Sequence, residues 1–301
     1  MLIIGGGPAG ISAALWGAEL GLSCCVIEAG PRLGGQLHSI YSPIRNYAGT
    51  AFTSGADCAR RFQGSLEGRR IDLRVSSSVN EIDPSRLSLT TNEGTELFGR
   101  SVVIASGVRR RRLLVSGEDR FHDKGILDSG ARDPGQVRGR RVAVIGGGDA
   151  ALENALILSE AAERVFLIHR RQEFSAREEF KSAVQSNNKI EPILQSTVHG
   201  FGGGDRLSFV EVRDNSGAQS KFDVSRAIVR IGFQPNSEFV QNILETDEKG
   251  YITVDAAGHT SQKGIYAVGD VACQVSPTIA SAAGSAATAL KAIYEMVRNS
   301  E

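Results

Sequence analysis

One local pattern occurs twice in the chain and constrains its fold more than any other feature. A short apolar strand leads into a glycine-rich turn, a helix and a second apolar strand, first over residues 2–28 and again over residues 141–171. Glycines let such a turn bend tightly and let a dinucleotide's phosphates approach, while free N–H groups at the helix start favour an anion. The repeated pattern predicts an α/β chain with two Rossmann-like nucleotide-binding units.

In the first turn the glycines fit the GxGxxG fingerprint. Gly5, Gly7 and Gly10 occupy its three positions, which serve the tight turn, the close approach of pyrophosphate and the packing of helix on strand. The second strand ends at Glu28, where such units carry an acid for the ribose hydroxyls. The first strand is short, so this unit can begin upstream of Met1.

In the second turn Gly146, Gly148 and Ala151 take the equivalent positions, but its second strand ends differently. Where an acid would suit NAD, the chain has His169, Arg170 and Arg171. A planar guanidinium can hold a 2′-phosphate through two hydrogen bonds, so this end favours NADPH over NADH. The alternative is that the arginines only solvate the end of a strand.

Further apolar strands bracket the second unit. One covers residues 102–107 and another residues 264–270, followed by a helix of small residues from Pro277 to about Val297 with Ser276 at its N-cap. The second unit therefore looks inserted into the first. We expect two three-layer ββα domains, one formed by residues 1–107 and 236–301 and the inserted one by residues 108–235.

Eight short motifs occur in a fixed order along the chain. They cover residues 5–10, 34–37, 105–107, 117–119, 146–151, 169–171, 232–236 and 269–270. In this ordered set the chain resembles the low-molecular-weight, thioredoxin-reductase-like branch of the pyridine nucleotide–disulfide oxidoreductases over nearly its whole length. The resemblance implies FAD in the outer domain, NADPH in the inserted one, a homodimer, and an NADPH domain that rotates to present nicotinamide to flavin.

The resemblance also assigns roles to single positions. For FAD these are Gly5, Gly7, Pro8, Ala9, Gly10, Glu28, Gly35, Gln36, Leu37, Asn46, Val79, Ala105, Gly107, Gly269, Asp270, Thr278 and Ile279. For NADPH they are Gly146, Gly148, Asp149, Ala150, Ala151, His169, Arg170 and Arg171. Gln36 and Asn46 match positions near the flavin, although both also suit polar loop residues, and Asp270 matches the acid that binds the ribityl chain.

The chain departs from this family where the redox dithiol belongs. The family's Cys-Ala-x-Cys-Asp aligns with residues 129–133, where Ser129 and Arg132 replace both cysteines and only Asp133 is kept. A disulfide substrate needs one thiolate to attack it and a second thiol to resolve the mixed disulfide. Thioredoxin reduction by the usual route is therefore not expected. Asp133 is a candidate proton donor near the flavin or, equally, a turn residue beside Pro134, and Arg132 either fixes an anionic acceptor or lies at the surface.

Smaller departures concern the two cofactor sites. An Arg-Gln pair of the family is replaced by Pro277 and Thr278, which leaves the backbone N–H groups of the last helix for the flavin. Ser175 stands where the family often has a third phosphate-binding arginine, and Arg177 can compensate. The chain has neither the C-terminal aromatic extension usual in the related ferredoxin–NADP reductases nor the first-turn cysteine of bacilliredoxin-type reductases, so neither subgroup fits it.

Composition narrows the remaining choices. Lys plus Arg and Asp plus Glu both number 34, so bulk charge gives no reason to expect nucleic acid or an anionic membrane as a partner. No apolar stretch approaches the ~20 residues of a membrane span, and the N-terminus lacks a signal sequence, which predicts a cytoplasmic protein. The four cysteines form no CxxC pair and read as reduced, buried thiols, and five scattered histidines suggest no metal site.

These observations predict an enzyme that passes electrons from NADPH through FAD to a non-disulfide acceptor. The acceptor is either a ferredoxin- or flavodoxin-like protein, or a quinone or other small molecule. A basic run over residues 109–112, with Arg138, Arg140 and Arg141, either steers an acidic partner or is a solvated hinge. The alternatives are a non-catalytic or regulatory flavoprotein, a reductase component whose partner supplies the thiols, and disulfide chemistry through Cys273.

Overall fold

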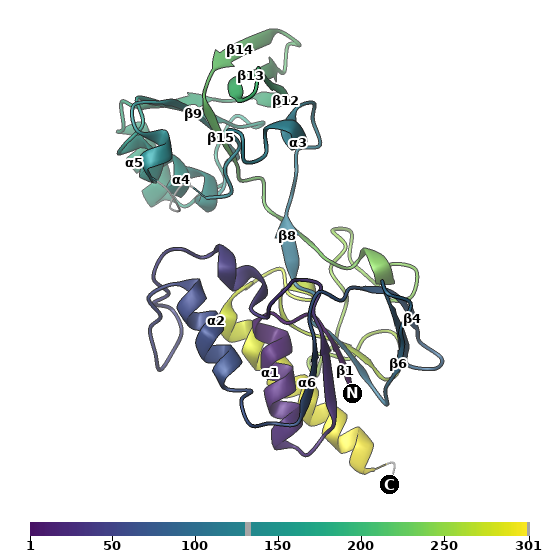
Figure 1. Ribbon diagram of the computed structural model, residues 1–301. Coiled ribbons are helices and arrows are strands. Elements are labelled where there is room, and N and C mark those ends of the chain that lie inside the picture. Colours follow the sequence, from purple (N-terminus) through teal and green to yellow (C-terminus); the bar gives the residue numbers. More distant parts are fainter. Residues whose placement is uncertain (130–133, 300–301) are drawn as a thin grey trace. The chain divides into compact units, whose positions relative to one another are not determined.

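The computed structural model describes residues 1–129 and 134–299 (Figure 1). The chain divides into two compact units, residues 1–109 with 234–301 (unit 1) and residues 110–233 (unit 2). The expected domain boundaries, 107/108 and 235/236, lie two residues from each crossing of the chain between the units.

Unit 1 carries a five-stranded parallel sheet, a three-stranded antiparallel sheet and three α-helices. Its elements in the first segment are β1 (Leu2–Ile4), α1 (Pro8–Glu19), β2 (Cys24–Ile27), η1 (Gly35–Ser39), α2 (Gly55–Gly64), β3 (Ile71–Arg74), β4 (Val79–Asp83), β5 (Ser88–Thr91), β6 (Glu96–Phe98), β7 (Val102–Ile104) and β8 (Val108–Arg110). Those in the second segment are β16 (Phe233–Pro235), η3 (Glu238–Val240), β17 (Ile265–Ala267), η4 (Gly269–Val271) and α6 (Ile279–Arg298).

The parallel sheet of unit 1 has the order β17-β7-β1-β2-β3 and is covered on both faces. Its strands are short apolar runs because both faces are buried. Ile3, Val26 and Val103 pack with α1 and α6 on one face. Ile4 and Ile104 pack on the other face with Ile82 and Leu89 of the antiparallel sheet β4-β5-β6. Unit 1 is therefore a three-layer ββα domain.

Unit 2 repeats this plan with fewer strands in its parallel sheet. Its elements are α3 (Glu118–Phe121), η2 (Pro134–Val137), β9 (Arg141–Ile145), α4 (Asp149–Ser159), β10 (Arg164–Ile168), α5 (Glu178–Gln185), β11 (Ile190–Ile193), β12 (Ser196–Gly203), β13 (Leu207–Asp214), β14 (Gln219–Asp223) and β15 (Arg226–Val229).

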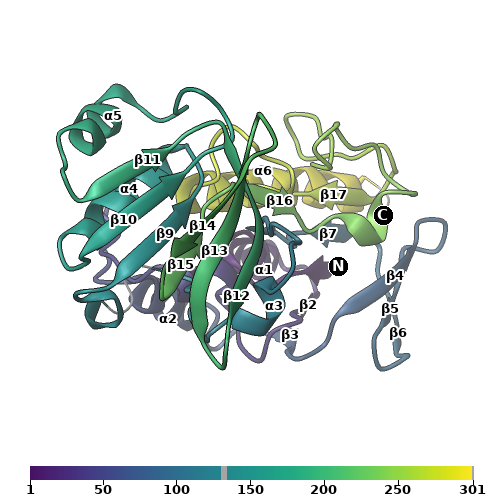
Figure 2. The same ribbon diagram turned by 90° about the horizontal axis from the view of Figure 1, so that it is seen from above.

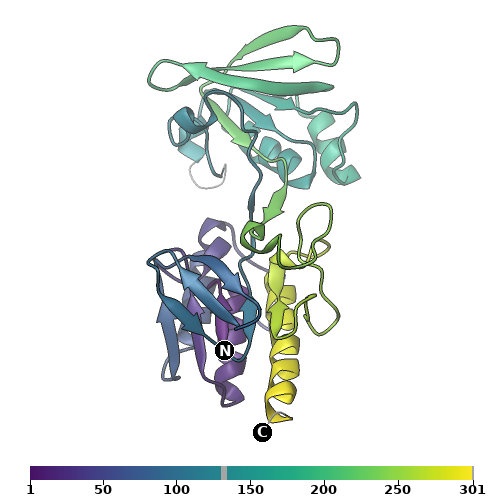
Figure 3. The same ribbon diagram turned by 90° about the vertical axis from the view of Figure 1, so that its right-hand side faces the viewer.

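The parallel sheet of unit 2 has the order β11-β10-β9-β15. Alternate residues of its strands face opposite layers, as the period of a β-strand requires. Val144 and Leu167 pack with α4 and α5, whereas Ile145 and Ile168 pack with the antiparallel sheet β12-β13-β14. Figures 2 and 3 show the three antiparallel strands as a layer apart from the parallel strands and their helices. The expected α/β class with two Rossmann-like ββα domains is confirmed.

Two chain segments connect the units, and they pair with each other. β8 and β16 form a two-stranded sheet that contains both crossings. In unit 1 Asn236 holds the returning segment, because its N–H donates to Gly107 O (2.9 Å) and its Nδ2 to Ser106 O (2.8 Å). The inserted unit is thus attached through paired strands rather than through two independent loops.

Candidate nucleotide-binding sites

The first glycine turn follows β1 in unit 1, and each of its three fingerprint glycines meets a different local requirement. Gly5 has φ +103°, and a Cβ there would lie 2.4 Å from Ala105 O. A Cβ on Gly10 would lie 1.8 Å from Gly5 O, so α1 packs directly on the turn. At Gly7, by contrast, no described atom lies within 4 Å of a built Cβ. The backbone of Gly7 is therefore open to a ligand, as a phosphate cradle needs.

Glu28 closes this turn from the end of β2. Its Oε2 accepts a hydrogen bond from Gly6 N and its Oε1 one from Gly30 N, both at 2.6 Å. Each carboxylate oxygen can accept more than one hydrogen bond, so the side chain still has capacity for hydroxyl groups. Glu28 both fixes the turn and offers acceptors beside it.

The other predicted FAD positions divide into exposed and buried side chains. Gln36 and Asn46 are exposed in loop segments of unit 1. Leu37 and Ala105 are 1% and 6% exposed and belong to hydrophobic clusters, and Val79 packs at the edge of one. Backbone groups of these buried positions, rather than their side chains, are what they can offer a cofactor.

At the far end of unit 1, η4 and α6 gather the last predicted positions. Gly269 has φ +71°, and burial raises the pKa of the neighbouring Asp270. The N-cap of α6 is Thr278 and not Ser276 as expected, because Thr278 and Ser281 form a reciprocal capping box. Thr278 Oγ1 accepts from Ser281 N at 3.1 Å, which places Ile279 as the first helical residue.

The second glycine turn, in unit 2, uses the same contacts with one difference. Gly146 has φ +147°, and a Cβ there would lie 2.2 Å from Arg230 O and 2.9 Å from Ala151 Cβ. Gly148 is open, with Ser175 Oγ at 3.9 Å as the nearest described atom to its built Cβ. Ala151 thus occupies the third fingerprint position, where unit 1 has glycine.

Beyond β10 the three predicted residues separate into one buried and two exposed side chains. His169 is 8% exposed, its Nε2 lies 3.0 Å from Glu173 O, and burial lowers its pKa. A Cβ on Gly147 would lie 2.2 Å from the His169 ring, so the imidazole supports the turn from below. Arg170 and Arg171 are exposed and form no ion pair among residues 1–129 and 134–299. These two arginines are the available phosphate ligands at this strand end.

The loop after Arg171 folds back over the turn. Ser175 N donates to Gly147 O at 2.8 Å, and Arg177 Nε donates to Asp149 Oδ2 at 2.7 Å. The Arg177 bond lowers the pKa of Asp149 together with the bond from Arg177 N. Arg177, expected to compensate for Ser175 as a phosphate ligand, is therefore engaged with Asp149 and with Glu179.

Comparison with known proteins assigns these turns to a family. The model of the pyridine nucleotide-disulphide oxidoreductases matches residues 1–289. The chain belongs to this family. It is 32% identical over 295 residues to a thioredoxin reductase of Mycolicibacterium smegmatis, covering 96% of the chain and 93% of that protein. A solved thioredoxin reductase of Lactococcus lactis superposes with a TM-score of 0.86 at 29% identity, covering 99% and 98% of the two chains.

A second type of relative is longer than this chain. A flavoprotein subunit of the alkyl hydroperoxide reductase of Escherichia coli (strain K12) is 31% identical over 277 residues, which cover 90% of the chain but 53% of that protein. The chain thus spans about half the length of that relative. Members of the pyridine nucleotide-disulphide oxidoreductase family related to this chain are NAD(P)H-dependent flavin enzymes that use FAD and NADPH, and this chain is such an oxidoreductase.

The residues of this oxidoreductase fit both cofactors. Each unit has an open glycine backbone, at Gly7 and at Gly148, beside the first turn of a helix that follows a parallel strand. Unit 1 adds the carboxylate of Glu28, and unit 2 adds the guanidinium groups of Arg170 and Arg171. These donor sets suit a ribose diol in the first unit and a 2′-phosphate in the second.

The thiols of this family member are dispersed and mostly shielded. All four cysteines are free, and the predicted catalytic residue Asp133 lies outside the described residues. Burial raises the pKa of Cys24, and it raises those of Cys25 and Cys58 to about 11. Since the thiolate is the nucleophile, these three groups are poor attackers at neutral pH.

Much of the predicted basic run is neutralised locally. Arg109 forms an ion pair with Glu238, and Arg112 Nη2 lies 2.6 Å from Asp119 Oδ1. Arg111 Nε donates to Phe233 O at 2.8 Å. These contacts use donors that a partner protein would need, so the run is weaker as a docking surface than its composition suggests.

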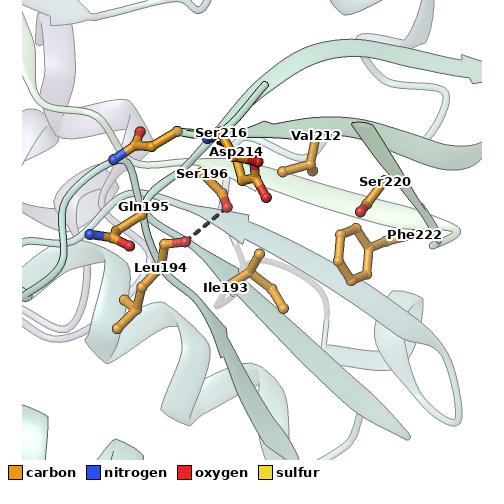
Figure 4. A pocket seen from close by; sticks show the side chains of 10 residues that line it. Ile193, Leu194, Gln195, Ser196, Val212, Asp214, Ser216, Ser220 and Phe222 are labelled. Carbon is orange, nitrogen blue, oxygen red and sulfur yellow. Dashed lines mark hydrogen bonds between the residues drawn. The ribbon is translucent and has the colours of Figure 1, made fainter. Parts of the chain in front are cut away.

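The oxidoreductase also has a cavity of about 360 Å³ in unit 2, away from the predicted ligands (Figure 4). It is lined by Ile193, Leu194, Gln195, Ser196, Val212, Asp214, Asn215, Ser216, Ser220 and Phe222. Ser196 Oγ donates to Leu194 O at 2.8 Å, so this hydroxyl is satisfied. Within the described residues no group of His, Cys, Asp and Glu could hold a metal ion, and no helix is long and apolar enough to cross a membrane.

One residue beside the second turn was missed from the sequence. Arg230 follows β15 and is 7% exposed, although it lies between Val229 and Ile231 in an apolar stretch. A charged residue at the end of a buried strand, two positions before Gly232, was the signal that could have identified it.

Proposed function

We propose that this family member transfers electrons from NADPH through FAD to an acceptor that is not a disulfide. The observation that carries the proposal is the chemistry of its thiols. Ser129 and Arg132 replace the family's two cysteines, and three of the four cysteines present have pKa values raised by burial. A disulfide substrate would find no adjacent thiol pair to attack and resolve it.

Unit 1 supplies the proposed FAD site. Residues 5–10 and Glu28 hold the adenosine diphosphate part, and Asp270 binds the ribityl chain. The capping box at Thr278 satisfies Ser281 N–H, while the first N–H groups of a helix have no partner within it. The positive end of the 20-residue helix α6 thus faces its ligand with unpaired donors and favours negative charge there.

Unit 2 supplies the proposed NADPH site. The turn at residues 146–151 holds the pyrophosphate, and Arg170 and Arg171 bind the 2′-phosphate. His169 orients the turn through its contact with Gly147 and is not proposed as a phosphate ligand. When bound, FAD takes two electrons from NADPH and can pass them on singly or in pairs.

The acceptor is proposed as a small molecule such as a quinone, or a one-electron carrier protein. The acidic-partner version depends on Arg138 and Arg140, which are exposed in unit 2, because Arg109 and Arg112 are already paired. A homodimer is also proposed, and sedimentation should then give twice the chain mass of 32.0 kDa.

A disulfide acceptor is the second candidate, and the relatives favour it. The similar proteins include thioredoxin reductases and a component of an alkyl hydroperoxide reductase. On this reading a partner, or a part of a longer protein, would supply the missing thiols.

An anaerobic titration tests the donor half. NADPH should bleach the oxidised flavin band, and NADH should do so more weakly. Reoxidation by a quinone, by a ferredoxin or flavodoxin, and by a model disulfide then ranks the acceptors. Alkylating all accessible thiols first should leave reoxidation by the preferred acceptor unchanged. Rapid disulfide reduction that alkylation abolishes, or that Cys273→Ser abolishes, would overturn the proposal, and so would a flavin that neither nucleotide reduces.

A further inference from the structure

Arg230 places a buried positive charge at the carboxyl end of β15. Its Nη1 donates to Val229 O at 2.9 Å and its Nη2 to Asp128 O at 2.7 Å, with Asn154 Oδ1 at 3.5 Å from Nη2. All three acceptors are neutral, and no carboxylate among the described residues forms an ion pair with this guanidinium. A guanidinium has five N–H donors, so two remain after these contacts.

The charges nearby do not neutralise Arg230. Burial and the like charge of Arg110 lower the pKa of Arg230 to about 10, and Asp128 acts in the opposite direction. The Asp128 carboxylate is itself exposed and lies 3.4 Å from His122 Nε2. Because a buried charge is costly without a counter-charge, this place would be stabilised by a bound anion.

The backbone of Arg230 lies at the glycine turn, and unit 1 shows what that position is. Arg230 N donates to Ile145 O at 2.7 Å, and its carbonyl lies 2.2 Å from a Cβ built on Gly146. In unit 1 Ala105 N donates to Ile4 O at 2.8 Å, and its carbonyl lies 2.4 Å from a Cβ built on Gly5. Arg230 is thus the counterpart of Ala105, which lies beside the other cofactor turn.

The order of strands decides which part of a dinucleotide would reach Arg230. In the sheet β11-β10-β9-β15 the proposed 2′-phosphate ligands follow β10, on one side of the turn that follows β9. Arg230 follows β15, on the other side. A dinucleotide binds across the carboxyl ends of such strands, so with its adenosine at β10 its nicotinamide half extends toward β15.

We propose that Arg230, aided by the positive potential of Arg110, binds the nicotinamide-side phosphate of NADPH and so positions the nicotinamide half. This role rests on the proposed NADPH site of unit 2 and adds a ligand to it. Arg230 is a binding and positioning residue, and its side chain is supported by Asp128 O and Asn154.

The test compares two ligands by calorimetry on the FAD-loaded protein. NADP⁺ carries both halves of the dinucleotide, whereas adenosine 2′,5′-bisphosphate carries only the adenosine half. Arg230→Met should weaken NADP⁺ about tenfold to a hundredfold, the usual effect of a lost charge-assisted hydrogen bond, and change the bisphosphate affinity less than about twofold. Arg170→Ala with Arg171→Ala should weaken both ligands.

Arg226→Met is the matched control. Arg226 lies on the same strand and is also 7% exposed, but it is at the amino end of β15, away from the turn. It should leave the ratio of the two affinities unchanged. Should Arg230→Met not fold, Arg230→Lys and the exposed Arg110→Ala replace it, the latter with an expected loss of about twofold to fivefold for NADP⁺ alone.

The outcomes separate this inference from the proposed function. An unchanged NADP⁺ affinity in the Arg230 variants, or an equal loss for both ligands, would overturn the assignment of Arg230 while the NADPH site stands. A wild-type protein that binds neither ligand would instead overturn the NADPH site itself, and the role of Arg230 with it.

Discussion

The two units solve one problem with the same backbone and opposite charges. In each, a parallel strand ends at a glycine with positive φ, and the carbonyl after a neighbouring strand lies against that glycine. Around the first turn the chain places Glu28, whereas around the second it places Arg170, Arg171 and Arg230. The backbone thus provides for a pyrophosphate in both units, and side chains at the strand ends select the nucleotide.

The units also differ in how tightly helix and turn are packed. A Cβ at Gly10 would lie 1.8 Å from Gly5 O, but unit 2 carries the methyl group of Ala151 at the same fingerprint position. The φ of Gly146 is +147° against +103° at Gly5, so the second turn is opened and has room for this methyl. Close packing at the third position is therefore a property of unit 1 alone.

Gly10→Ala should have the largest effect. Although alanine is the better helix former, its Cβ would overlap a backbone oxygen that cannot move without the turn, at a cost of about 3 kcal/mol or more. Unit 1 should unfold at lower urea concentration and lose FAD on purification. The single tryptophan, Trp16, lies in α1 and reports on this unit by its fluorescence.

The matched change in unit 2 is Ala151→Gly. It removes a methyl from a turn that already accommodates it and should cost about 1 kcal/mol through helix propensity and lost packing. FAD content and the Trp16 transition should stay as in the wild type. Equal losses from the two substitutions would show that the turns are packed alike and would break the comparison.

Removing both phosphate-binding arginines should have the next largest effect. Arg170→Ala with Arg171→Ala takes two exposed guanidinium groups from the end of β10, which should reduce the preference for NADPH over NADH by about 2–3 kcal/mol, roughly 30- to 150-fold. Single-turnover rates of flavin reduction at varied NADPH and NADH measure this. A preserved preference would place the 2′-phosphate elsewhere.

Glu28→Gln tests the opposite charge in unit 1. The carboxylate accepts from Gly6 N and Gly30 N, and an amide offers an acceptor to only one of them while turning an NH₂ toward the other. The substitution should cost unit 1 about 1–2 kcal/mol and weaken FAD retention. Glu19→Gln, an exposed acid on α1 in the same unit, is the control and should retain FAD. Undiminished FAD content in Glu28→Gln would remove its proposed role.

Much of this architecture follows from the sequence because it depends on local patterns. Short β-branched runs followed by glycines predict β1 and β9, and the ordered motifs predict the ββα domains with one inserted in the other. Glycine turns are predictable since only glycine tolerates both the positive φ and the missing space at Gly5 and Gly146. The site residues of both turns stay predictions until ligands are measured.

The sequence failed where contacts are made over long distances or where two local solutions compete. The N-cap of α6 was placed at Ser276, two residues early, since the Thr278–Ser281 pair could not be distinguished from it by propensity. His169 resembled a phosphate ligand because it precedes two arginines, but its ring is buried against Gly147. Arg230 was missed because its neighbour, the turn at Gly146, lies 84 positions earlier in the chain.

The smallest expected effect is a pH dependence confined to unit 2. Burial lowers the pKa of His169, so the folded state resists protonation that the unfolded chain accepts below its ordinary pKa of about 6.5. The stability contributed by neutral His169 is complete above that pH and is lost as the pH falls toward the lowered value. Hydrogen exchange of β9 and β10 should therefore accelerate at mildly acidic pH, before that of the unit 1 sheet.

His169→Gln should remove this acceleration and also raise exchange slightly at neutral pH, because the glutamine fills less of the space under Gly147. His199→Gln, an exposed histidine on β12 of the same unit, should keep the wild-type pH profile. If both variants keep that profile, the acid sensitivity of unit 2 arises from another group. The contrast with unit 1 would then reduce to the acid and the arginines at the strand ends, since the imidazole beneath the second turn would contribute packing alone.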